Sequence, residues 1–388
     1  MIYMDHAATT PVKPEVLEAM LPYFSTNYSN ASGVYKLARF NRKAIDDARA
    51  VVADHLGARN DEIFFTSGGT EADNWAIKGV VESLKDRGNH IITTNIEHHA
   101  VLHTCQYLEK QGFKVTYLPV NQDGLITPEQ VAQTITEKTI LISIMYANNE
   151  IGTIMPISEI GKIASDRGVL FHTDAVQAVG QIPINVRKEN IDLLSLSGHK
   201  FYGPKGTGAL YIRMGLKLPS LLHGGGQERG RRAGTENVPG IVGLAKAIYL
   251  AYRGLEDKNT RVRELRDYLI NGIYERIPCC KLNGHREQRL SNIVNFSFGF
   301  MDGESLLLLL DSKGIIASNG SACTASSLDP SHVLEALGLS RKRASGSIRF
   351  SLGEENTRQE VDCLLNILPS VVEKSRIISP LYEQERWN

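Results

Sequence analysis

One lysine, Lys200, stands where a reactive amine is expected. It follows the apolar run 192–196, which predicts a strand, and it precedes a turn rich in glycine and proline at 203–206. Folds of the α/β class place their chemistry at the carboxyl ends of such strands. In partly apolar surroundings a lysine loses its proton more readily, and the neutral amine can form a Schiff base with a carbonyl. Because most lysines are only solvated loop residues, this hypothesis depends on partners elsewhere in the chain.

Two polar side chains follow another predicted strand, 169–173. Asp174 comes directly after the strand, and Gln177 is three residues further on. A carboxylate at this position could pair with a protonated pyridine nitrogen, and the glutamine could hydrogen-bond a ring hydroxyl. An aspartate after a buried strand is also a common helix cap. Beside Lys200, however, the pair predicts a site for pyridoxal 5'-phosphate (PLP).

A glycine pair could hold the phosphate of that cofactor. Gly68, Gly69 and Thr70 join the predicted strand 63–66 to a helix. Glycines let a ligand approach the backbone, and the amides at a helix start favour an anion. Thr70 also begins a T-x-x-D pattern typical of a helix cap, so a plain capped helix fits equally well. Neither G-x-G-x-x-G nor G-x-x-x-x-G-K-[ST] is present, which argues against dinucleotides and nucleoside triphosphates.

Two further pairs follow strand ends. His98 or His99 could stack on a cofactor ring and move a proton, although a histidine packed at a helix start is equally compatible. Asn148 and Asn149 are candidate hydrogen-bond donors to cofactor or substrate, although asparagines in this setting often only form a turn.

Three more side chains extend the hypothesis. Arg349 lies inside the predicted strand 347–352, where a guanidinium needs either a substrate carboxylate or an internal salt bridge. Cys323 is the only strong nucleophile in a run of small residues, 318–327, which predicts a mobile loop able to carry a thiol to a substrate. Thr235 belongs to a flexible basic loop that could reach a phosphate.

The elements that must position these residues alternate along the chain. Short apolar β-forming runs separated by helix-length segments predict a mostly parallel, seven-stranded sheet covered on both faces; the runs are 63–66, 90–94, 114–118, 140–145, 169–173, 193–196 and 208–212. The later strands and helices predict a smaller α+β domain. We therefore expect an α/β protein with a large domain at 14–256 and a small domain formed by 1–13 and 257–388.

Composition limits the alternatives. A chain of 388 residues exceeds the usual size of one hydrophobic core. Lys+Arg 43 balance Asp+Glu 43, so the charge predicts neither nucleic acid nor membrane as a partner. The absence of a signal segment or a long apolar run predicts a cytoplasmic protein. Five cysteines without metal-ligand spacing favour neither disulfides nor a structural metal site.

Taken together, these motifs resemble those of the class V aminotransferase group of fold-type I PLP enzymes, and specifically of the cysteine desulfurases of the NifS/IscS type. The resemblance runs nearly the whole chain; its segments are 3–10, 67–74, 97–99, 147–152, 172–177, 197–200, 231–237 and 320–324. Each motif alone would be weak, but their ordered combination is specific.

The resemblance implies roles for individual residues. Catalysis would fall to three of them, the Schiff-base Lys200, the acid/base His98 and the persulfide-forming Cys323. The PLP ring would contact Asp174 and Gln177, and the substrate would contact Asn148, which also belongs to the cofactor site, and Arg349. The PLP phosphate would be held by a separate group of residues: Gly69, Thr70, Ser197, His199 and Thr235 of the partner subunit in a homodimer.

The implied reaction converts L-cysteine to L-alanine and leaves a persulfide on Cys323. That sulfur would pass to an acceptor, such as an Fe–S scaffold protein or a tRNA-thiolation protein. No resident metal is expected, although Cys323 could transiently ligate an Fe–S cluster. A class V aminotransferase of small amino acids, a selenocysteine lyase and a sulfur-relay protein with little activity are the alternatives.

Overall fold

Seven strands form the central sheet of the computed structural model, which describes residues 1–319 and 330–379. In spatial order they are β2 (Ile63–Thr66), β8 (Gly208–Ile212), β7 (Leu193–Ser197), β6 (Leu170–Asp174), β5 (Thr139–Ser143), β3 (His90–Thr94) and β4 (Lys114–Leu118). β8 is antiparallel to both of its neighbours, and the remaining pairs are parallel. The expected mostly parallel seven-stranded sheet is therefore confirmed.

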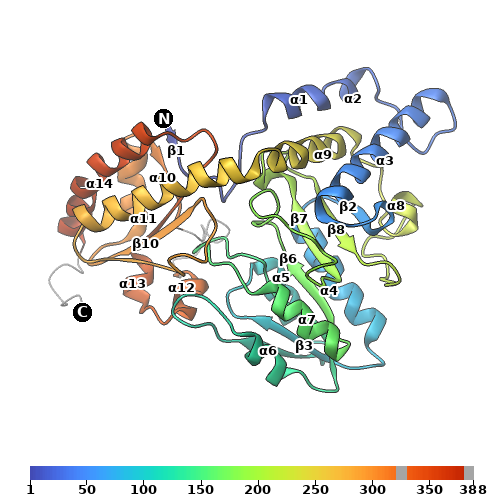
Figure 1. Cartoon of the computed structure of the whole chain (residues 1–388), viewed down its shortest axis with the longest axis horizontal. Helices are drawn as coiled ribbons and strands as arrows, with labels where there is room; N and C mark the ends of the chain where they lie inside the picture. The colour runs from blue at the N-terminus through green and yellow to red at the C-terminus, as the bar shows by residue number, and fades with distance from the viewer. Residues whose placement is uncertain (320–329, 380–388) are drawn as a thin grey trace.

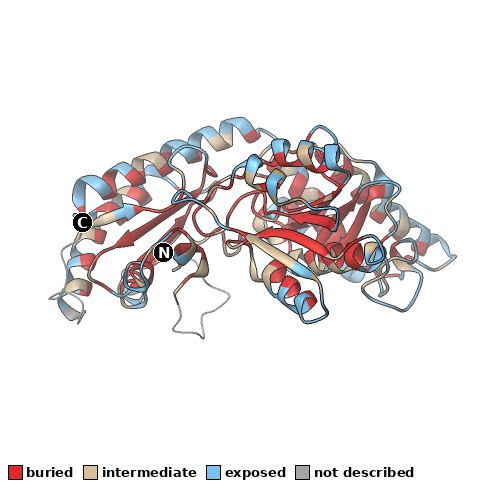
Figure 2. Cartoon of the chain, turned by 90° about the horizontal axis from the view of Figure 1, so that it is seen from below, coloured by how far each residue is buried: buried red, intermediate tan, exposed pale blue. Residues whose placement is uncertain are grey.

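Helices cover both faces of this sheet because its strands are apolar on both sides. α4 (Gly69–Leu84) and α5 (His99–Glu109) share one core with alternate strand residues. α3 (Lys36–Leu56), α7 (Ile157–Arg167) and α9 (Val238–Tyr252) share another core on the opposite face. Figure 2 shows the buried strands enclosed by helices whose outer faces are exposed.

A smaller antiparallel sheet lies apart from the first one (Figure 1). Its order is β12 (Ser347–Ser351), β10 (Ile293–Phe298), β9 (Cys280–Leu282). Three helices pack on it around a separate core: α10 (Leu255–Arg276), α11 (Gly303–Asp311) and α14 (Arg358–Ile378). The exact limits 14–256 and 257–388 for the two domains stay a prediction.

The N-terminal segment belongs to both parts. β1 (Ile2–Tyr3) pairs with β11 (Ile315–Ile316), and Met4 lies in the smaller core. Helix α1 (Pro14–Met20) then packs on α9. Residues 4–13 must therefore cross from one part to the other, directly past the carboxyl ends of the large sheet's strands.

The remaining elements connect these layers. They are α2 (Pro22–Ser25), η1 (Asn60–Glu62), α6 (Pro128–Thr134), η2 (Gly198–Lys200), α8 (Gln227–Gly230), α12 (His332–Ala336) and α13 (Arg341–Ser345). Gly254 takes a left-handed conformation, φ 68°, and separates α9 from α10. In the described ranges, no helix combines the length and apolar character needed to span a bilayer.

Candidate active site

A cavity of about 300 Å³ opens at the carboxyl ends of the parallel strands. Its wall brings together most of the residues predicted from the sequence: Gly69, Thr70, His98, Asp174, Gln177, Ser197, His199, Lys200 and Arg349. Their positions in the chain span 69 to 349. Such convergence of titratable and polar side chains at a strand edge is typical of an α/β active site.

Lys200 lies in η2, immediately after β7. Its Nζ donates hydrogen bonds to the backbone carbonyls of Ala7, at 2.7 Å, and Ala8, at 2.8 Å. The Gln177 side chain also donates to the Ala7 carbonyl, at 3.0 Å. The sequence assigned no role to these two alanines, because backbone acceptors carry no signature in residue type.

Asp174 forms the end of β6 and is fully enclosed on the floor of the cavity. Its Oδ1 accepts a hydrogen bond from the amide of Val176, at 2.9 Å, so it stabilises a turn as well as facing the cavity. Burial raises the pKa of the Asp174 carboxyl, while the amide bond and the charge of Lys200 act against that shift. A cation or an N–H donor bound at this floor would find an acceptor without its own counter-ion.

Three other buried acids on the cavity wall, Asp73, Glu97 and Glu150, were missed from the sequence. Glu97 accepts hydrogen bonds from the amide of Met145, at 3.0 Å, and from the hydroxyl of Thr94, at 2.7 Å. Burial raises the pKa of Glu97 to about 8. Asp73 was interpreted only as part of a cap pattern, although its position one turn inside α4 already placed it near the strand ends.

The start of α4 lies on the wall beside Ser197. Gly68 has φ 153°, a conformation that favours glycine, and a Cβ on Gly69 would lie 2.6 Å from Val176 Cγ2. The first-turn amides of this 16-residue helix therefore meet the cavity at a place without side chains, which suits a phosphate. The cap prediction for Thr70 was wrong, because the helix begins at Gly69 and Thr70 lies within its first turn.

His98 is the N-cap of α5, as the helix-start alternative predicted, and it also lines the cavity; its role toward a cofactor stays a prediction. Its Nδ1 accepts a hydrogen bond from the amide of Ala100, at 3.2 Å. Burial, and then the charge of Lys200, lowers the pKa of His98 to about 4. The neutral ring with Nδ1 as acceptor must carry its proton on Nε2.

Asn148 and Asn149 lie in different environments. Asn148 is 0% exposed, its amide donates to the carbonyl of Ile96 at 2.9 Å, and its Oδ1 accepts from Glu150 N at 2.8 Å and from Ile151 N at 3.0 Å. The structure therefore places Asn148 in a turn behind the wall, whereas Asn149 lines the cavity. The expectation that Asn148 contacts cofactor and substrate is corrected in favour of its neighbour, since the Asn148 side chain is already saturated.

Arg349 has one of its two expected environments, the internal salt bridge, and its contact with a substrate carboxylate stays a prediction. Its Nη2 forms an ion pair with Asp5 at 2.8 Å, and its Nη1 donates to the carbonyl of Asn149 at 2.8 Å. The side chain is only 2% exposed and lines the cavity. Its Nε has no hydrogen-bond partner among the described residues. A buried N–H without an acceptor is costly, so this side of the guanidinium is suited to an incoming anion.

Thr235 is exposed and does not line the cavity of this single chain. Its loop is held against the start of α4 by Arg232, whose Nε lies 2.8 Å from Glu71. Thr235 as a phosphate contact in the partner's site stays a prediction. Cys323 lies outside the described residues.

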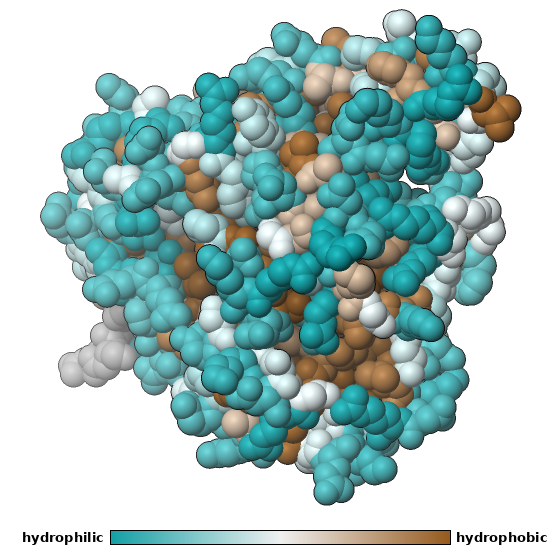
Figure 3. Space-filling model, turned by 45° about the vertical axis from the view of Figure 1, so that its right-hand side comes forward, coloured by the Kyte–Doolittle hydropathy of each residue, from teal (hydrophilic) through white to brown (hydrophobic). Residues whose placement is uncertain are grey.

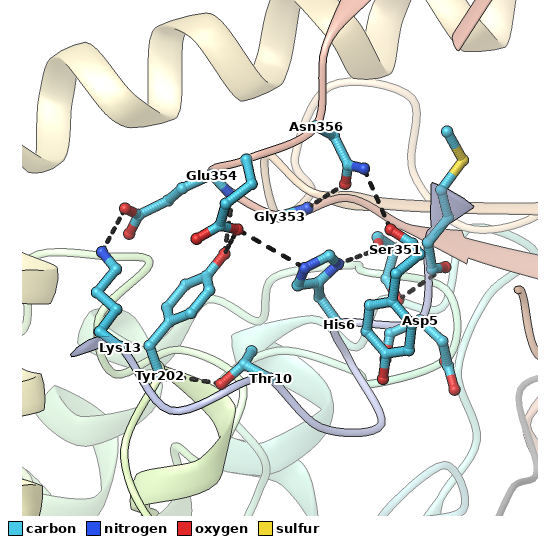
Figure 4. A network of polar contacts seen from close by, with 12 residues as sticks. Asp5, His6, Thr10, Lys13, Tyr202, Ser351, Gly353, Glu354 and Asn356 are labelled. Atoms are coloured by element: carbon cyan, nitrogen blue, oxygen red, sulfur yellow. Dashed lines mark hydrogen bonds and ion pairs between the residues drawn. The ribbon is translucent and has the colours of Figure 1, made fainter. Parts of the chain in front are cut away.

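Figure 4 shows how the N-terminal segment is tied to both parts of the molecule. His6 Nδ1 forms a hydrogen bond with the carbonyl of Ser351 at 3.1 Å, and Lys13 forms an ion pair with Glu354 at 2.5 Å. Ser351 and Glu354 lie on the small-domain side. On the other side, the amide of Tyr202 donates to Thr10 at 2.7 Å. This network fixes the two alanine carbonyls that hold Lys200.

Comparisons with known proteins agree with this geometry. The family model for class V aminotransferases matches residues 2–364, and the chain belongs to that family. Its relatives include a protein named cysteine desulfurase IscS from Methanosarcina thermophila, 59% identical over 99% of this chain and 95% of the relative. Another cysteine desulfurase IscS, from Clostridium botulinum strain Hall, is 56% identical over 100% of this chain and 98% of that protein. The resemblance inferred from the motifs is confirmed.

Solved structures also match over most of the chain. A NifS-like protein superposes with a TM-score of 0.91 and 40% identity, covering 96% of this chain and 99% of that one. The structure described as SspA in complex with cysteine has a TM-score of 0.81 and 41% identity, covering 92% and 100%. The expected PLP fold type I is thus confirmed at the level of the whole chain.

Proposed function

We propose that this chain is a PLP-dependent cysteine desulfurase, which converts L-cysteine to L-alanine and leaves a persulfide on Cys323. The observation that carries the proposal is the meeting of Lys200, Asp174 and His98 in one cavity, each at the end of a different strand or loop. The relatives named cysteine desulfurase and the neighbour in complex with cysteine support the substrate.

The residues present fit the cofactor. Asp174 would hold the pyridine nitrogen, Gln177 the ring hydroxyl, and the α4 start, Ser197 and His199 the phosphate. The fit rests on three features of the cavity: a buried carboxyl on its floor, a wall at Gly69 that a Cβ would fill, and a lysine amine at its centre. When bound to Lys200, PLP supplies an electron sink for the carbon that bears the substrate amine.

The chain's own groups would bind and orient the amino acid. Arg349, with its unpartnered buried Nε, is suited to the substrate carboxylate, and Asn149 replaces Asn148 as the adjacent wall residue. Because Nδ1 of the neutral His98 ring accepts from the Ala100 amide, the ring proton is on Nε2, and the side chain lines the cavity. His98 could therefore give the substrate a hydrogen bond through Nε2–H, and it could take up a proton only at Nδ1, after that atom leaves the Ala100 amide.

A homodimer and a sulfur acceptor complete the proposal. Exposed large apolar side chains cluster in the first forty residues, namely Leu17, Leu21, Phe24, Tyr28, Val34, Tyr35 and Phe40. Figure 3 shows hydrophobic groups that interrupt a mostly hydrophilic face. Apolar side chains concentrated in this way favour a protein partner. A second copy covering them would agree with Thr235 of the partner subunit reaching this chain's phosphate site.

The direct experiment is borohydride reduction of the holoenzyme followed by peptide mapping. We expect a pyridoxyl group on Lys200, and none in Lys200→Ala. Cys323→Ser should keep the visible absorption of bound PLP but release no sulfide or alanine from cysteine with a reductant. Unchanged turnover in Cys323→Ser would support the aminotransferase or lyase alternatives, and a label on another lysine would reject the site.

A further inference from the structure

Asp73 is a carboxyl on the cavity wall whose role is unassigned and which lies close to Asp174. It projects from α4, is 1% exposed and lines the cavity. One of its carboxylate oxygens lies within 4.8 Å of ligand atoms of both Asp174 and His98. Its Oδ1 finds no hydrogen-bond partner in the described part of the chain. A buried carboxylate oxygen without a hydrogen-bond partner normally has a function, or it binds a group that is absent from the structure.

Among the described residues, the ion-pair contact of Asp73 is with His172, and Lys200 is bound instead by the carbonyls of Ala7 and Ala8. His172 approaches to 3.6 Å through Nε2, but that ring is held by the hydroxyls of Ser195, at 3.0 Å, and Ser143, at 2.8 Å. Burial lowers the pKa of His172 to about 3, so the imidazole is neutral. It therefore cannot neutralise an ionised Asp73.

The charged and titratable groups facing Asp73 come from three elements: His172 and Asp174 from β6, Glu97 and His98 from the segment before α5, and Lys200 from η2. Two of these are acids. Burial, followed by the charge of Asp174, raises the pKa of Asp73 well above its usual value. Two close carboxyls in a buried site cannot both ionise without a large cost, so they share one proton.

We propose that Asp73 is a positioning residue of the PLP site: it stays protonated and keeps a single negative charge, that of Asp174, beside the pyridine nitrogen. This inference rests on the proposed function. The neutral acid has a hydrogen to offer to the Asp174 carboxylate, while its Oδ1 lies on the side of His172, 3.6 Å from Nε2. Asp73 touches neither substrate nor cofactor in this role; it acts through Asp174.

The experiment compares PLP with 1-deaza-PLP, in which a CH group replaces the ring nitrogen, by fluorescence titration of the apoprotein. Asp73→Asn keeps the size, the neutrality and a hydrogen-bond donor, so we expect PLP affinity within about 3-fold of wild type. Asp73→Ala loses the donor to a charged group, so PLP affinity should fall about 10- to 100-fold. The affinity of Asp73→Ala for 1-deaza-PLP should fall less than about 3-fold.

Thr173→Val is the matched control, because Thr173 is buried next to Asp174 and its Oγ1 likewise has no partner in the described ranges. Thr173→Val should change the affinity neither for PLP nor for 1-deaza-PLP. Infrared difference spectra between wild type and Asp73→Asn provide a readout independent of binding: the contribution of Glu97 cancels, and a C=O band of a protonated acid should remain on the wild-type side.

Three results would overturn the inference. They are the absence of this band from the difference spectrum, an equal loss of PLP affinity for Asp73→Asn and Asp73→Ala, and a loss with 1-deaza-PLP as large as with PLP, which would indicate a structural effect alone. Binding of Zn²⁺ to the apoprotein that Asp73→Asn abolishes would also overturn it, since the carboxyl would then be a metal ligand. Borohydride labelling of Lys200 in wild type and in the same variants separates this inference from the proposed function. If wild type carries no pyridoxyl label on Lys200, the proposed function is rejected. If it carries the label, the results above test only the role of Asp73.

Discussion

Replacing Arg349 by lysine should weaken cysteine binding without slowing the chemistry. The guanidinium already uses Nη2 for Asp5 and Nη1 for the carbonyl of Asn149, and it keeps Nε for a ligand. Lysine would retain the charge in the same strand but has one nitrogen in place of three. It cannot hold Asp5 and the backbone while also forming a planar pair with a substrate carboxylate.

The magnitude follows from the hydrogen bonds lost. A hydrogen bond to a charged group contributes about 1.5–3 kcal/mol. Since about 1.4 kcal/mol corresponds to a tenfold change in affinity, losing one such bond should raise KM for L-cysteine about 10- to 150-fold. If the carboxylate is bound equally in ground and transition states, kcat should stay within about 3-fold of wild type.

The assay is alanine formation against cysteine concentration, in the presence of a reductant. Because Arg349 is almost completely buried, urea unfolding must show that Arg349→Lys remains folded. Arg358→Lys, on the exposed side of α14, is the matched control and should leave KM unchanged. A folded Arg349→Lys with KM within about 3-fold of wild type would refute the assignment of the substrate carboxylate to this residue.

Three further predictions follow from buried groups. Glu228→Ala should lower the free energy of unfolding by about 3–5 kcal/mol in urea, because it leaves Arg49, paired at 2.8 Å with both side chains 3% exposed, as an unpartnered buried charge. Burial raises the pKa of Asp174 to about 6, so the native apoprotein binds more protons than the unfolded chain and its stability should fall as pH rises from about 4 to about 6; Asp174→Asn should weaken this dependence, to which Glu97 also contributes, in urea titrations and abolish tight PLP binding. Gly69→Ala should weaken PLP binding about 5- to 100-fold in fluorescence titrations through its 2.6 Å contact with Val176, and Val176→Ala should restore much of the affinity.

The sheet was predictable because its signal is local. Each strand is a short apolar run followed by a turn, and all seven predicted runs are strands of the large sheet. The ends of three were displaced: 140–145 is β5 (Thr139–Ser143), 169–173 is β6 (Leu170–Asp174) and 193–196 is β7 (Leu193–Ser197). Polar residues that follow such runs are brought to one edge by the parallel topology, so Lys200 and Asp174 could be paired before any contact was known.

The errors at Asn148, Asp73 and Thr70 also have a physical cause. Adjacent residues in a turn point in different directions, and composition does not say which of Asn148 and Asn149 will satisfy the turn and which will face the cavity. The carboxyl of Asp73 and the cap role of Thr70 depend on where α4 begins. The sequence pattern alone did not establish that α4 would begin at Gly69, with Gly68 and not Thr70 as the residue that precedes the helix.

The position of Lys200 illustrates what a sequence cannot contain. Its amine is held by carbonyls 193 and 192 residues away, which any residue type would provide. Those carbonyls accept hydrogen bonds, so they hold the amine as a donor, and it must leave them to act as a nucleophile. The segment that carries them is tied at Ser351 and Glu354 to the small-domain side and at Tyr202 to the lysine's own turn (Figure 4). Any displacement of one part of the molecule against the other therefore alters the hydrogen bonds of the reactive amine.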